Sequence, residues 1–201
     1  MKKIAIYYSP VGNIQLEYED GVVTALKNAE AGAKGEPLSA LAELVFRQLD
    51  EYFAGTRTEF TFPYRLHGTP FQEKVWEALR QIPYGETRSY KDIAEAIGHP
   101  KAYRAVGMAN NANPIFIAIP CHRVIGANGS LVGYGGGLEM KKALLELEKK
   151  VLSQIKERKN CTEFYKWKSI YDGINKAGVV QHDLSFKFDK LSRMLHSQNL
   201  S

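Results

Sequence analysis

A cysteine and a histidine stand side by side at the end of an apolar run, in a pattern that can present a reactive thiol. Cys121 and His122 follow an Ile-Phe-Ile-Ala-Ile run at 115–119 and one proline. We expect this run to form a short buried strand that fixes the position of the cysteine. A thiol is nucleophilic as its thiolate, which needs a neighbouring base or cation. The pair is therefore a candidate for nucleophilic chemistry, and a buried cysteine beside a structural histidine is the alternative.

The geometry of an extended segment limits how His122 can act on its neighbour. Successive residues of a strand point to opposite sides. A direct thiol–imidazole contact, as in a thiol protease, is therefore awkward, whereas a contact through water is easier. The imidazole then needs a carboxylate to orient it. The helix expected next along the chain offers three candidates, Glu139, Glu146 and Glu148.

The composition is that of a folded globular protein without a disulfide framework or a membrane span. The chain has 201 residues, 44% hydrophobic and 24% charged, as in ordinary folded domains, and its net charge of +5 favours a polyanionic partner. Its two cysteines, Cys121 and Cys161, form no Cys-x-x-Cys pair, so we expect no metal site and no disulfide framework. The apolar N-terminus stops at Ser9-Pro10, too soon for a signal peptide, and no run is long enough to span a membrane. We expect a cytoplasmic protein.

Residues 1–65 show the pattern of a small α/β domain. Apolar and polar residues alternate in three stretches up to residue 28, separated by turn signals, which predicts an antiparallel meander. Apolar residues from 38 to 52 recur at helical spacing before Gly55, which predicts a helix. Phe60 and Phe62 predict one more short strand.

Residues 66–150 show the pattern of a mainly helical domain. Thr69, Pro70 and Gln72 form a capping box that starts a helix. Shorter helices are expected from Ser89 to Ile97 and from Lys101 to the neighbourhood of Asn110, and together they outline a helix-turn-helix. A last helix is expected from Leu138 towards Ile155.

Residues 151–201 differ in composition from the rest of the chain. They contain nine Lys and Arg against five Asp and Glu, or four of the five excess positive charges. Aromatic residues between 164 and 171 favour an appended helix. We treat this segment as a basic C-terminal extension without an assigned role.

The helix expected from Lys101 carries an arginine among small residues. Arg104 is flanked by Ala102, Ala105, Gly107 and Ala109. A small-sided helix face can enter a minor groove about 6 Å wide, where a single arginine can wedge into the base stack. Lys101 and the helix N-terminus would hold phosphate. A solvated helix face is the alternative interpretation of Arg104.

The segments singled out above resemble the O6-alkylguanine-DNA alkyltransferases, also called methylated-DNA–protein-cysteine methyltransferases. The Pro-Cys-His-Arg-Val stretch at 120–124 is similar to the signature of that family. The similarity extends to 49–55, 71–76, 84–87, 89–90, 104–107, 113–114 and 133–138. It covers approximately residues 1–150 and leaves 151–201 outside.

The resemblance implies DNA repair by stoichiometric transfer of an alkyl group from O6 of guanine to Cys121. The substrate would be double-stranded DNA, from which the damaged nucleotide is flipped. The protein would be a monomer that is consumed in one turnover and needs no cofactor or metal. The metal-binding cysteines found in the N-terminal domains of some members are absent here.

The resemblance also implies roles for single residues. Cys121 would be the acceptor, and His122, through water and with Glu148 behind it, would generate the thiolate. Tyr90 would hold the guanine, and Asn113 would tie the recognition helix to the active-site segment. DNA contacts would come from Tyr90, Lys101, Arg104, Ala105, Gly107 and Arg123, with Arg104 replacing the flipped nucleotide. The base pocket would be lined by Val124, Tyr134, Gly135 and Gly136, although some members carry a hydroxyl residue in place of Gly135.

Three alternatives remain. A non-catalytic lesion-binding relative would lack the acceptor cysteine. A regulatory DNA-binding protein with the same helix-turn-helix would not need Cys121 or Glu148. A thiol hydrolase would need a pocket for an amide, which the sequence does not indicate.

Overall fold

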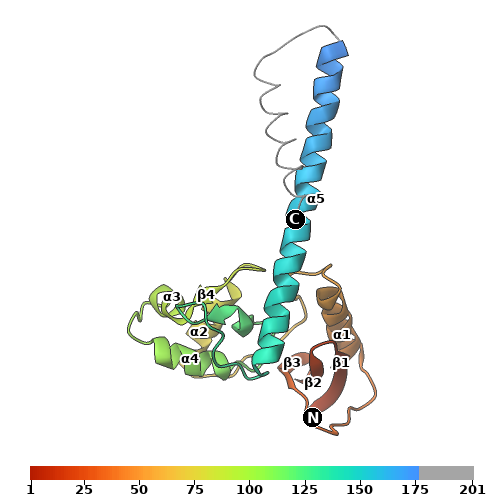
Figure 1. The fold of residues 1–201 in the computed structure, drawn as a ribbon. Coiled ribbons are helices and arrows are strands. Elements are labelled where there is room, and N and C mark those ends of the chain that lie inside the picture. The colour runs from red at the N-terminus through yellow and green to blue at the C-terminus, as the bar shows by residue number, and fades with distance from the viewer. Residues whose placement is uncertain (177–201) are drawn as a thin grey trace. The chain divides into compact units, whose positions relative to one another are not determined.

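A computed structural model of the chain describes residues 1–176 (Figure 1). Residues 1–149 form one compact unit, and a second unit begins at residue 150. Within residues 1–176, no helix is both long and apolar enough to cross a membrane. The same residues contain no cluster of three or more His, Cys, Asp or Glu side chains that could hold a metal ion.

The N-terminal part is a three-stranded antiparallel meander covered by one helix. Strands β1 (Lys3–Ser9), β2 (Gly12–Glu19) and β3 (Val22–Asn28) pair in chain order. Helix α1 (Ala40–Phe53) begins at the cap Ser39, and its buried residues join the core of the sheet. The expected α/β domain is confirmed.

The strand expected at Phe60 and Phe62 is not formed. The side chain of Gln48 on α1 accepts a hydrogen bond from the backbone N–H of Thr61 and donates one to its hydroxyl group. The N–H and hydroxyl of Thr61 therefore have partners without strand pairing, and both phenylalanine rings pack into or against the core. The following residues reach the sheet at one isolated bridge between Tyr64 and Val23 of β3, in which Val23 donates to the carbonyl oxygen of Pro63 and accepts from the N–H of Arg65.

The second part is helical, as expected. Helices α2 (Pro70–Arg80) and α3 (Tyr90–Ala96) each begin with a complete capping box. Helix α4 (Tyr103–Asn111) begins two residues later than expected and has no side-chain cap, so Lys101 lies in the turn before it. The indole of Trp76 on α2 donates a 2.8 Å hydrogen bond to the carbonyl oxygen of Ala109, which holds α2 against α4.

A short parallel ladder that the sequence did not predict joins the start of α3 to the active-site segment. Strand β4 (Arg88–Ser89) pairs with β5 (Val124–Ile125), the two residues that follow a single 3-10 turn, η1 (Cys121–Arg123). Ser89 is also the cap of α3. The ladder therefore fixes the first residue of α3 relative to the cysteine.

The apolar run at 115–119 is buried, but it does not form the expected strand. It folds back on itself, with the N–H of Ile119 donating to the carbonyl oxygen of Ile115 at 2.9 Å. Ile117 at the bend has φ of +69°, a conformation that is strained for a β-branched residue. The side chain of Asn113 holds the bend, since it accepts from the N–H of Ile115 and donates to the carbonyl oxygen of Ile119.

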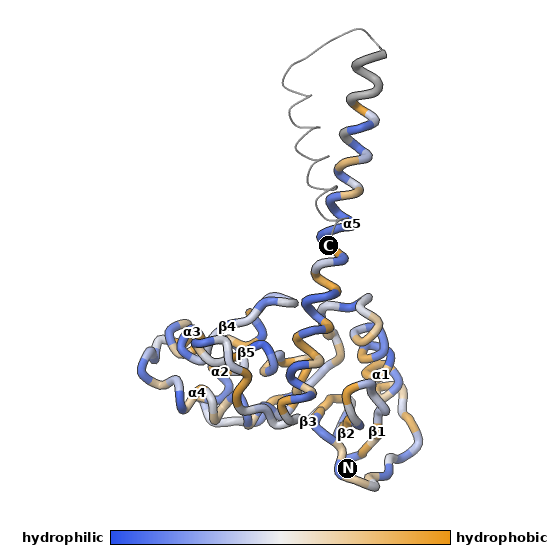
Figure 2. Tube along the Cα trace, viewed as in Figure 1, coloured by the Kyte–Doolittle hydropathy of each residue, from blue (hydrophilic) through white to orange (hydrophobic). Residues whose placement is uncertain are grey.

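Helix α5 (Leu138–Lys176) is one continuous helix. The expected end near Ile155 and the separate appended helix were both wrong, because neither Gly nor Pro interrupts the sequence from 138 to 172. Hydrophobic and polar residues are interspersed along its described length (Figure 2). Its first turns, up to residue 149, lie between α1 and the group formed by α2 and α4 (Figure 1).

Candidate active site

Cys121 lies at the start of η1 with only 3% of its surface exposed. It lines a cavity of about 130 Å³ between β3, the end of α4 and the glycine-rich loop. From the sequence-predicted base pocket, Tyr134, Gly135 and Gly136 line the same cavity, together with Asn113. Val124 is fully buried and is not among the lining residues.

His122 faces a carboxylate rather than the cavity. Its Nε2 lies 2.9 Å from Oε1 of Glu148, and both side chains are fully buried. Of the three candidate glutamates, Glu148 is therefore the one that reaches the imidazole. The Nδ1 atom of His122 is buried without a hydrogen-bond partner among the described residues. Burial lowers the pKa of His122 despite the neighbouring carboxylate, so the ring rests in its neutral form.

Glu148 lies at the centre of a buried polar network. Its two oxygens accept hydrogen bonds from the Tyr52 hydroxyl, the Gly85 N–H, His122, and Nε and Nη2 of Arg123. Burial alone would raise the pKa of this carboxyl, but its hydrogen bonds with His122 and Arg123 and its ion pair with Arg123 hold the pKa well below its usual range. The carboxylate is therefore ionised and joins α1, the turn after α2, η1 and α5.

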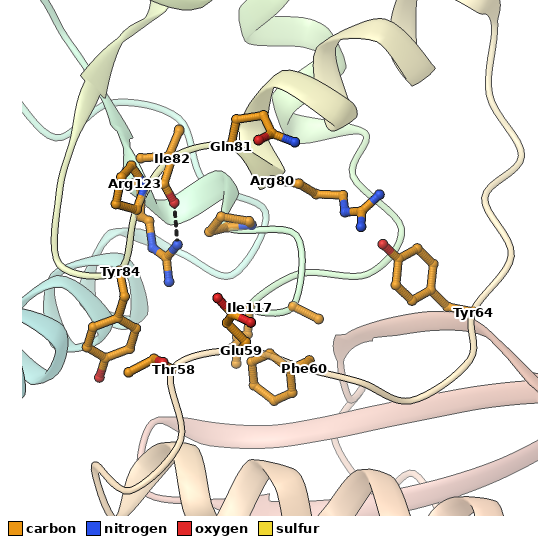
Figure 3. A pocket seen from close by; sticks show the side chains of 13 residues that line it. Thr58, Glu59, Phe60, Tyr64, Arg80, Gln81, Ile82, Tyr84, Ile117 and Arg123 are labelled. Carbon is orange, nitrogen blue, oxygen red and sulfur yellow. Dashed lines mark hydrogen bonds between the residues drawn. The ribbon is translucent and has the colours of Figure 1, made fainter.

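Arg123 was expected at the DNA, and the structure places it elsewhere. It is buried, with Nε 2.8 Å from Glu148 and Nη1 donating to the carbonyl oxygen of Ile82 at 2.7 Å (Figure 3). Its guanidinium also lies over the Tyr84 ring, 5.4 Å from the centroid. Because its donors are used inside the protein, Arg123 positions Glu148 and does not face DNA.

A larger cavity of about 500 Å³ lies beside Arg123, lined by the segment from Thr58 to Tyr64, the end of α2 and the bend before η1 (Figure 3). Cys121 is not among its lining residues. The reactive thiol therefore belongs to the smaller cavity.

Lys141 is a site residue that the sequence interpretation missed. Its side chain is fully buried, and Nζ donates to the carbonyl oxygens of Val124 at 2.6 Å and Val132 at 2.9 Å. Burial raises the pKa of the Cys121 thiol to about 11, and the Asn113 hydrogen bond and the Lys141 charge oppose that rise. The thiol is thus protonated at neutral pH and needs a base at the moment of reaction.

Tyr90 lies at the start of α3, against the recognition helix. Its ring faces Gly107 of α4, and its hydroxyl donates to the carbonyl oxygen of Val132 at 3.0 Å. A cavity of about 450 Å³ is lined by Tyr90, Arg104, Gly107, Asn111 and residues at 132–133. Asn111 also lines the Cys121 cavity, so the two cavities are adjacent.

The exposed face of α4 carries Arg104 and Ala105, as expected, with Lys101 exposed before the helix. It is not as small-sided as the sequence suggested, because Ala109 is buried while Tyr103 is 47% and Met108 77% exposed. The Arg104 guanidinium lies 5.8 Å from the centroid of the Tyr103 ring, which supports the arginine from one side.

Two neighbouring glycines of the loop differ in what they tolerate. A Cβ atom on Gly136 would lie 2.6 Å from the Tyr134 ring and 2.7 Å from the sulfur of Met140. A Cβ atom on Gly135 would make only an ordinary contact, 3.6 Å from Oδ1 of Asn111. A side chain on Gly136 would therefore displace the Tyr134 ring or the Met140 sulfur, whereas the absence of a hydroxyl at Gly135 is not forced by space.

Both parts of the compact unit match one family. Residues 2–66 match the ribonuclease-like domain, and residues 70–150 the DNA-binding domain, of 6-O-methylguanine DNA methyltransferase. The chain belongs to this family. The methylated-DNA–protein-cysteine methyltransferase of Mycobacterium leprae is 53% identical over 147 residues, covering 70% of this chain and 88% of the relative. The constitutive methylated-DNA–protein-cysteine methyltransferase of Bacillus subtilis is 46% identical over 152 residues, covering 70% and 92%.

Solved structures of family members are similar to this chain in both sequence and fold. The Mycobacterium tuberculosis O6-methylguanine methyltransferase is 48% identical with a TM-score of 0.68, covering 75% of this chain and 94% of that one. A structure of Mycobacterium tuberculosis OGT in complex with DNA is 50% identical with the same TM-score of 0.68, covering 73% and 92%.

For this alkyltransferase family member, one of the two residues missed by sequence reasoning, Lys141, had a signal in the helix pattern. Lys141, Leu144 and Glu148 share one face of α5, because they stand three and four residues apart. Two charged residues on a face that also carries a buried leucine predict a buried polar site. Tyr52 lies on the apolar stripe of α1, and nothing in its spacing indicated that its hydroxyl reaches Glu148.

Proposed function

We propose that this protein repairs double-stranded DNA by transferring an alkyl group from O6 of guanine to Cys121 in a single turnover. The observation that carries the proposal is a cavity-lining thiol followed directly by a histidine that is paired with a buried glutamate. The related proteins from M. leprae and B. subtilis are named for this activity.

The chemistry follows from the states of the three side chains. Cys121 rests as a thiol. Nε2 of His122 is held by Glu148, which leaves Nδ1 to accept the thiol proton through a water molecule. The sulfur attacks the alkyl carbon as the bond from that carbon to O6 breaks, and the electron pair of that bond passes to the guanine. Reprotonation of the base restores guanine, with Tyr90 as its hydrogen-bond partner.

The product explains why the protein is consumed. The thioether on Cys121 has no hydrolysable bond, so the thiol is not regenerated. Each molecule therefore removes one lesion.

DNA binding is proposed for the exposed face of α4. Extruding a nucleotide costs roughly a few kcal/mol, which Arg104 offsets by filling the gap in the stack. Lys101 and the backbone near Ala105 and Gly107 meet the phosphates and groove walls. Binding is largely independent of sequence and weakens with salt.

The proposal also covers the organisation of the chain. It has an α/β domain at 1–65, an alkyl-acceptor domain at 66–150 and a basic extension at 151–201. The protein acts as a monomer in the cytoplasm on DNA that carries O6-alkylguanine. Cys121 disfavours a non-catalytic lesion-binding protein, and the His122–Glu148 pair would have no use in a purely regulatory one.

The test is mass spectrometry after incubation with duplex DNA that contains one O6-methylguanine. We expect one added methyl group on the Cys121 peptide and none on the exposed Cys161, which serves as an internal control. Cys121→Ser should remain unmodified. An unmethylated Cys121 in the wild-type protein would refute the proposal.

A further inference from the structure

Asn111 is the last residue of α4, and among the residues that the structure describes it alone lines both of the adjacent cavities. Its side chain is exposed, and its amide makes no hydrogen bond to any residue between 1 and 176. No partner therefore fixes the orientation of the amide, and a half-turn about its last bond exchanges Oδ1 and Nδ2. The amide can thus offer either a donor or an acceptor to a ligand that extends into both cavities.

The surroundings of Asn111 place it between the proposed base-holding tyrosine and the thiol. Gly107 lies one helical turn before Asn111, about 6 Å away along the helix axis. The Tyr90 ring packs against Gly107. Towards the smaller cavity, a Cβ atom on Gly135 would lie 3.6 Å from Oδ1 of Asn111. Gly135 and Cys121 both line the smaller cavity, so Asn111 stands between that cavity and Tyr90.

An extruded guanine must extend into both cavities to meet the groups proposed for it. Tyr90, its proposed hydrogen-bond partner, lines the larger cavity of about 450 Å³. Tyr134 and Gly135 of the base pocket line the smaller cavity of about 130 Å³, as does Cys121. The O6 atom lies at the end of the base that enters the smaller cavity, because the alkyl carbon on O6 must meet the sulfur. That end of the base passes Asn111, which brings O6 within reach of the amide.

The other polar side chains that line the smaller cavity are closed off, already bonded or too far from the larger cavity. The Tyr134 hydroxyl and Oδ1 of Asn110 are closed to solvent, so an incoming base does not reach them. Asn113 uses both ends of its amide on the bend before η1, and Lys27 forms an ion pair at 2.7 Å with a glutamate of β2. Asn28 is exposed, but it does not line the larger cavity. This leaves the residue that the two cavities share.

We propose that Asn111 is a catalytic residue whose amide N–H donates a hydrogen bond to O6 of the extruded guanine, an inference that rests on the proposed alkyl transfer. As the sulfur forms its bond to the alkyl carbon, the bond from that carbon to O6 breaks and its electron pair passes to O6. The oxygen gains negative charge in this step, so a donor placed beside it stabilises the transition state more than the bound substrate. The amide keeps its proton. The thiol loses one proton and the guanine takes up one at N1, so the charges balance.

The first test compares two exposed amides of the smaller cavity. Asn111→Ala removes the proposed donor, and Asn28→Ala is the matched control. Single-turnover rate constants are measured on duplex DNA containing O6-methylguanine, at protein concentrations that saturate the rate, so that changes in DNA affinity do not enter. We expect Asn111→Ala to transfer the methyl group at least about tenfold more slowly, the effect of one hydrogen bond to a charged acceptor. Asn28→Ala should stay within about twofold of wild type. Equal rates for the two variants would overturn the inference.

A second substrate distinguishes a contact with the leaving atom from a structural role. In S6-methyl-6-thioguanine the leaving atom is sulfur, which is a weak hydrogen-bond acceptor. We expect the ratio of wild-type to Asn111→Ala rates to fall below about threefold with this substrate, because the amide gains little from sulfur. A distorted pocket would slow the transfer from both substrates alike. The same ratio with the oxygen and the sulfur substrate would therefore refute a contact with O6.

The glycine-rich loop allows the lost donor to be replaced. Because a Cβ atom on Gly135 would point to the Asn111 amide at an ordinary contact distance, a serine hydroxyl there reaches the space that Asn111→Ala empties. We expect Gly135→Ser to restore the rate of Asn111→Ala to within about threefold of wild type. Gly135→Ala in the same background adds the Cβ atom without a donor and should restore nothing. Equal rates for these two double variants are incompatible with the inference.

Mass spectrometry of the wild-type protein separates this inference from the function on which it rests. If wild-type Cys121 gains a methyl group and Asn111→Ala reacts at the wild-type rate, only the role of Asn111 is wrong. If wild-type Cys121 stays unmethylated, the proposed function is wrong and the inference falls with it.

Discussion

Nε2 of His122 lies 2.9 Å from Oε1 of Glu148 in a region closed to solvent. The contact assigns the Nε2 proton to the carboxylate side and leaves the lone pair of the neutral ring on Nδ1. A histidine adjacent in sequence to the nucleophile can thus be a base although its other nitrogen points into the protein.

Replacing the carboxylate should damage both catalysis and folding. In Glu148→Gln, His122 loses its orienting anion, and Arg123 keeps a buried charge without a counterion. We expect the single-turnover repair rate to fall about 100-fold and the free energy of unfolding to fall by about 3 kcal/mol. Glu146→Gln, on the exposed face of the same helix, is the control and should change neither. A Glu148→Gln protein as stable as the wild type at pH 7 would contradict this.

The stability contribution of Glu148 should depend on pH in one direction. Its folded pKa lies well below the usual 4.5, so folding favours the ionised form. The contribution is complete above pH 4.5 and is lost as the pH falls below it. The difference in unfolding free energy between wild type and Glu148→Gln, measured by urea denaturation, should be constant from pH 7 to about 5 and shrink at lower pH. A difference in unfolding free energy that grows as the pH falls would contradict a lowered pKa of Glu148 in the folded protein.

The hydroxyl of Tyr52 should stabilise the protein through its 2.8 Å hydrogen bond to Glu148. Tyr52→Phe removes this donor from a buried carboxylate, and we expect a loss of about 2 kcal/mol in unfolding free energy. Tyr18→Phe is a matched control, because the Tyr18 hydroxyl is buried with no hydrogen-bond partner among the described residues. Its removal should be neutral or stabilising. If both variants lost the same unfolding free energy, the hydrogen bond between the Tyr52 hydroxyl and Glu148 would not stabilise the protein.

The two loop glycines should respond differently to alanine. Gly136→Ala forces the Tyr134 ring or the Met140 sulfur to move, whereas Gly135→Ala meets only an ordinary contact. We expect the alkyl-transfer rate of Gly136→Ala to fall at least about tenfold, because a misplaced pocket wall disturbs the attack geometry. Gly135→Ala should stay within about twofold of wild type. The reverse order in single-turnover assays would exclude a role for Gly136 in shaping the pocket.

The charge of Lys141 should lower the pKa of Cys121, which burial raises to about 11. Reaction of Cys121 with iodoacetamide should accelerate with pH beyond the range of ordinary thiols, because the thiolate fraction is still rising there. Lys141→Met should slow this reaction at pH 9 and leave Cys161 unchanged within the same molecule. Lys142→Met, on the exposed side of the helix, controls for net charge. Peptide mass spectrometry resolves both thiols, and identical Cys121 rates in the two variants would rule out the Lys141 effect.

Arg104 should matter for duplex DNA and much less for the chemistry itself. Arg104→Ala should repair a lesion in double-stranded DNA about 100-fold more slowly, since nothing fills the stack, and should retain reactivity towards a lesion in a short single strand. Arg80→Ala, exposed on α2 and paired with Glu77, controls for loss of one positive charge. Equal slowing on both substrates would indicate a role other than holding the stack open.

The sequence predicted those secondary-structure elements that are marked by residues close together in the chain. The capping box at Thr69 and the cap at Ser89 marked helix starts to the residue, because a side chain there bonds a backbone only three positions away. The run at 115–119 was wrongly predicted to be a strand. A continuous apolar segment indicates that the residues are buried, but it does not indicate which backbone conformation they adopt. Its bend is set by Asn113, whose bonds to Ile115 and Ile119 no periodicity reveals.

Long-range polar contacts were the least predictable part of the site. From the sequence, Arg123 was expected to contact DNA. In the structure its guanidinium donates hydrogen bonds to the carbonyl oxygen of Ile82 and to the carboxylate of Glu148. The β4–β5 ladder consists of two residues on each side, too few to produce an alternating pattern. From residue types alone, the sequence indicated a histidine beside the thiol and three glutamates that could orient it; the family resemblance implied Glu148, and Glu148 is the one that contacts His122.

The hydrogen bond between Tyr52 and Glu148 spans 96 positions of the chain and crosses from the segment that matches the ribonuclease-like domain to the one that matches the DNA-binding domain. The two segments are therefore not freely interchangeable modules. A chimera that grafts a foreign N-terminal half without a phenol at this place onto residues 70–201 should lose the stability that this hydrogen bond contributes. Recombination between distant relatives at the junction near residue 67 thus carries a cost that neither half shows alone.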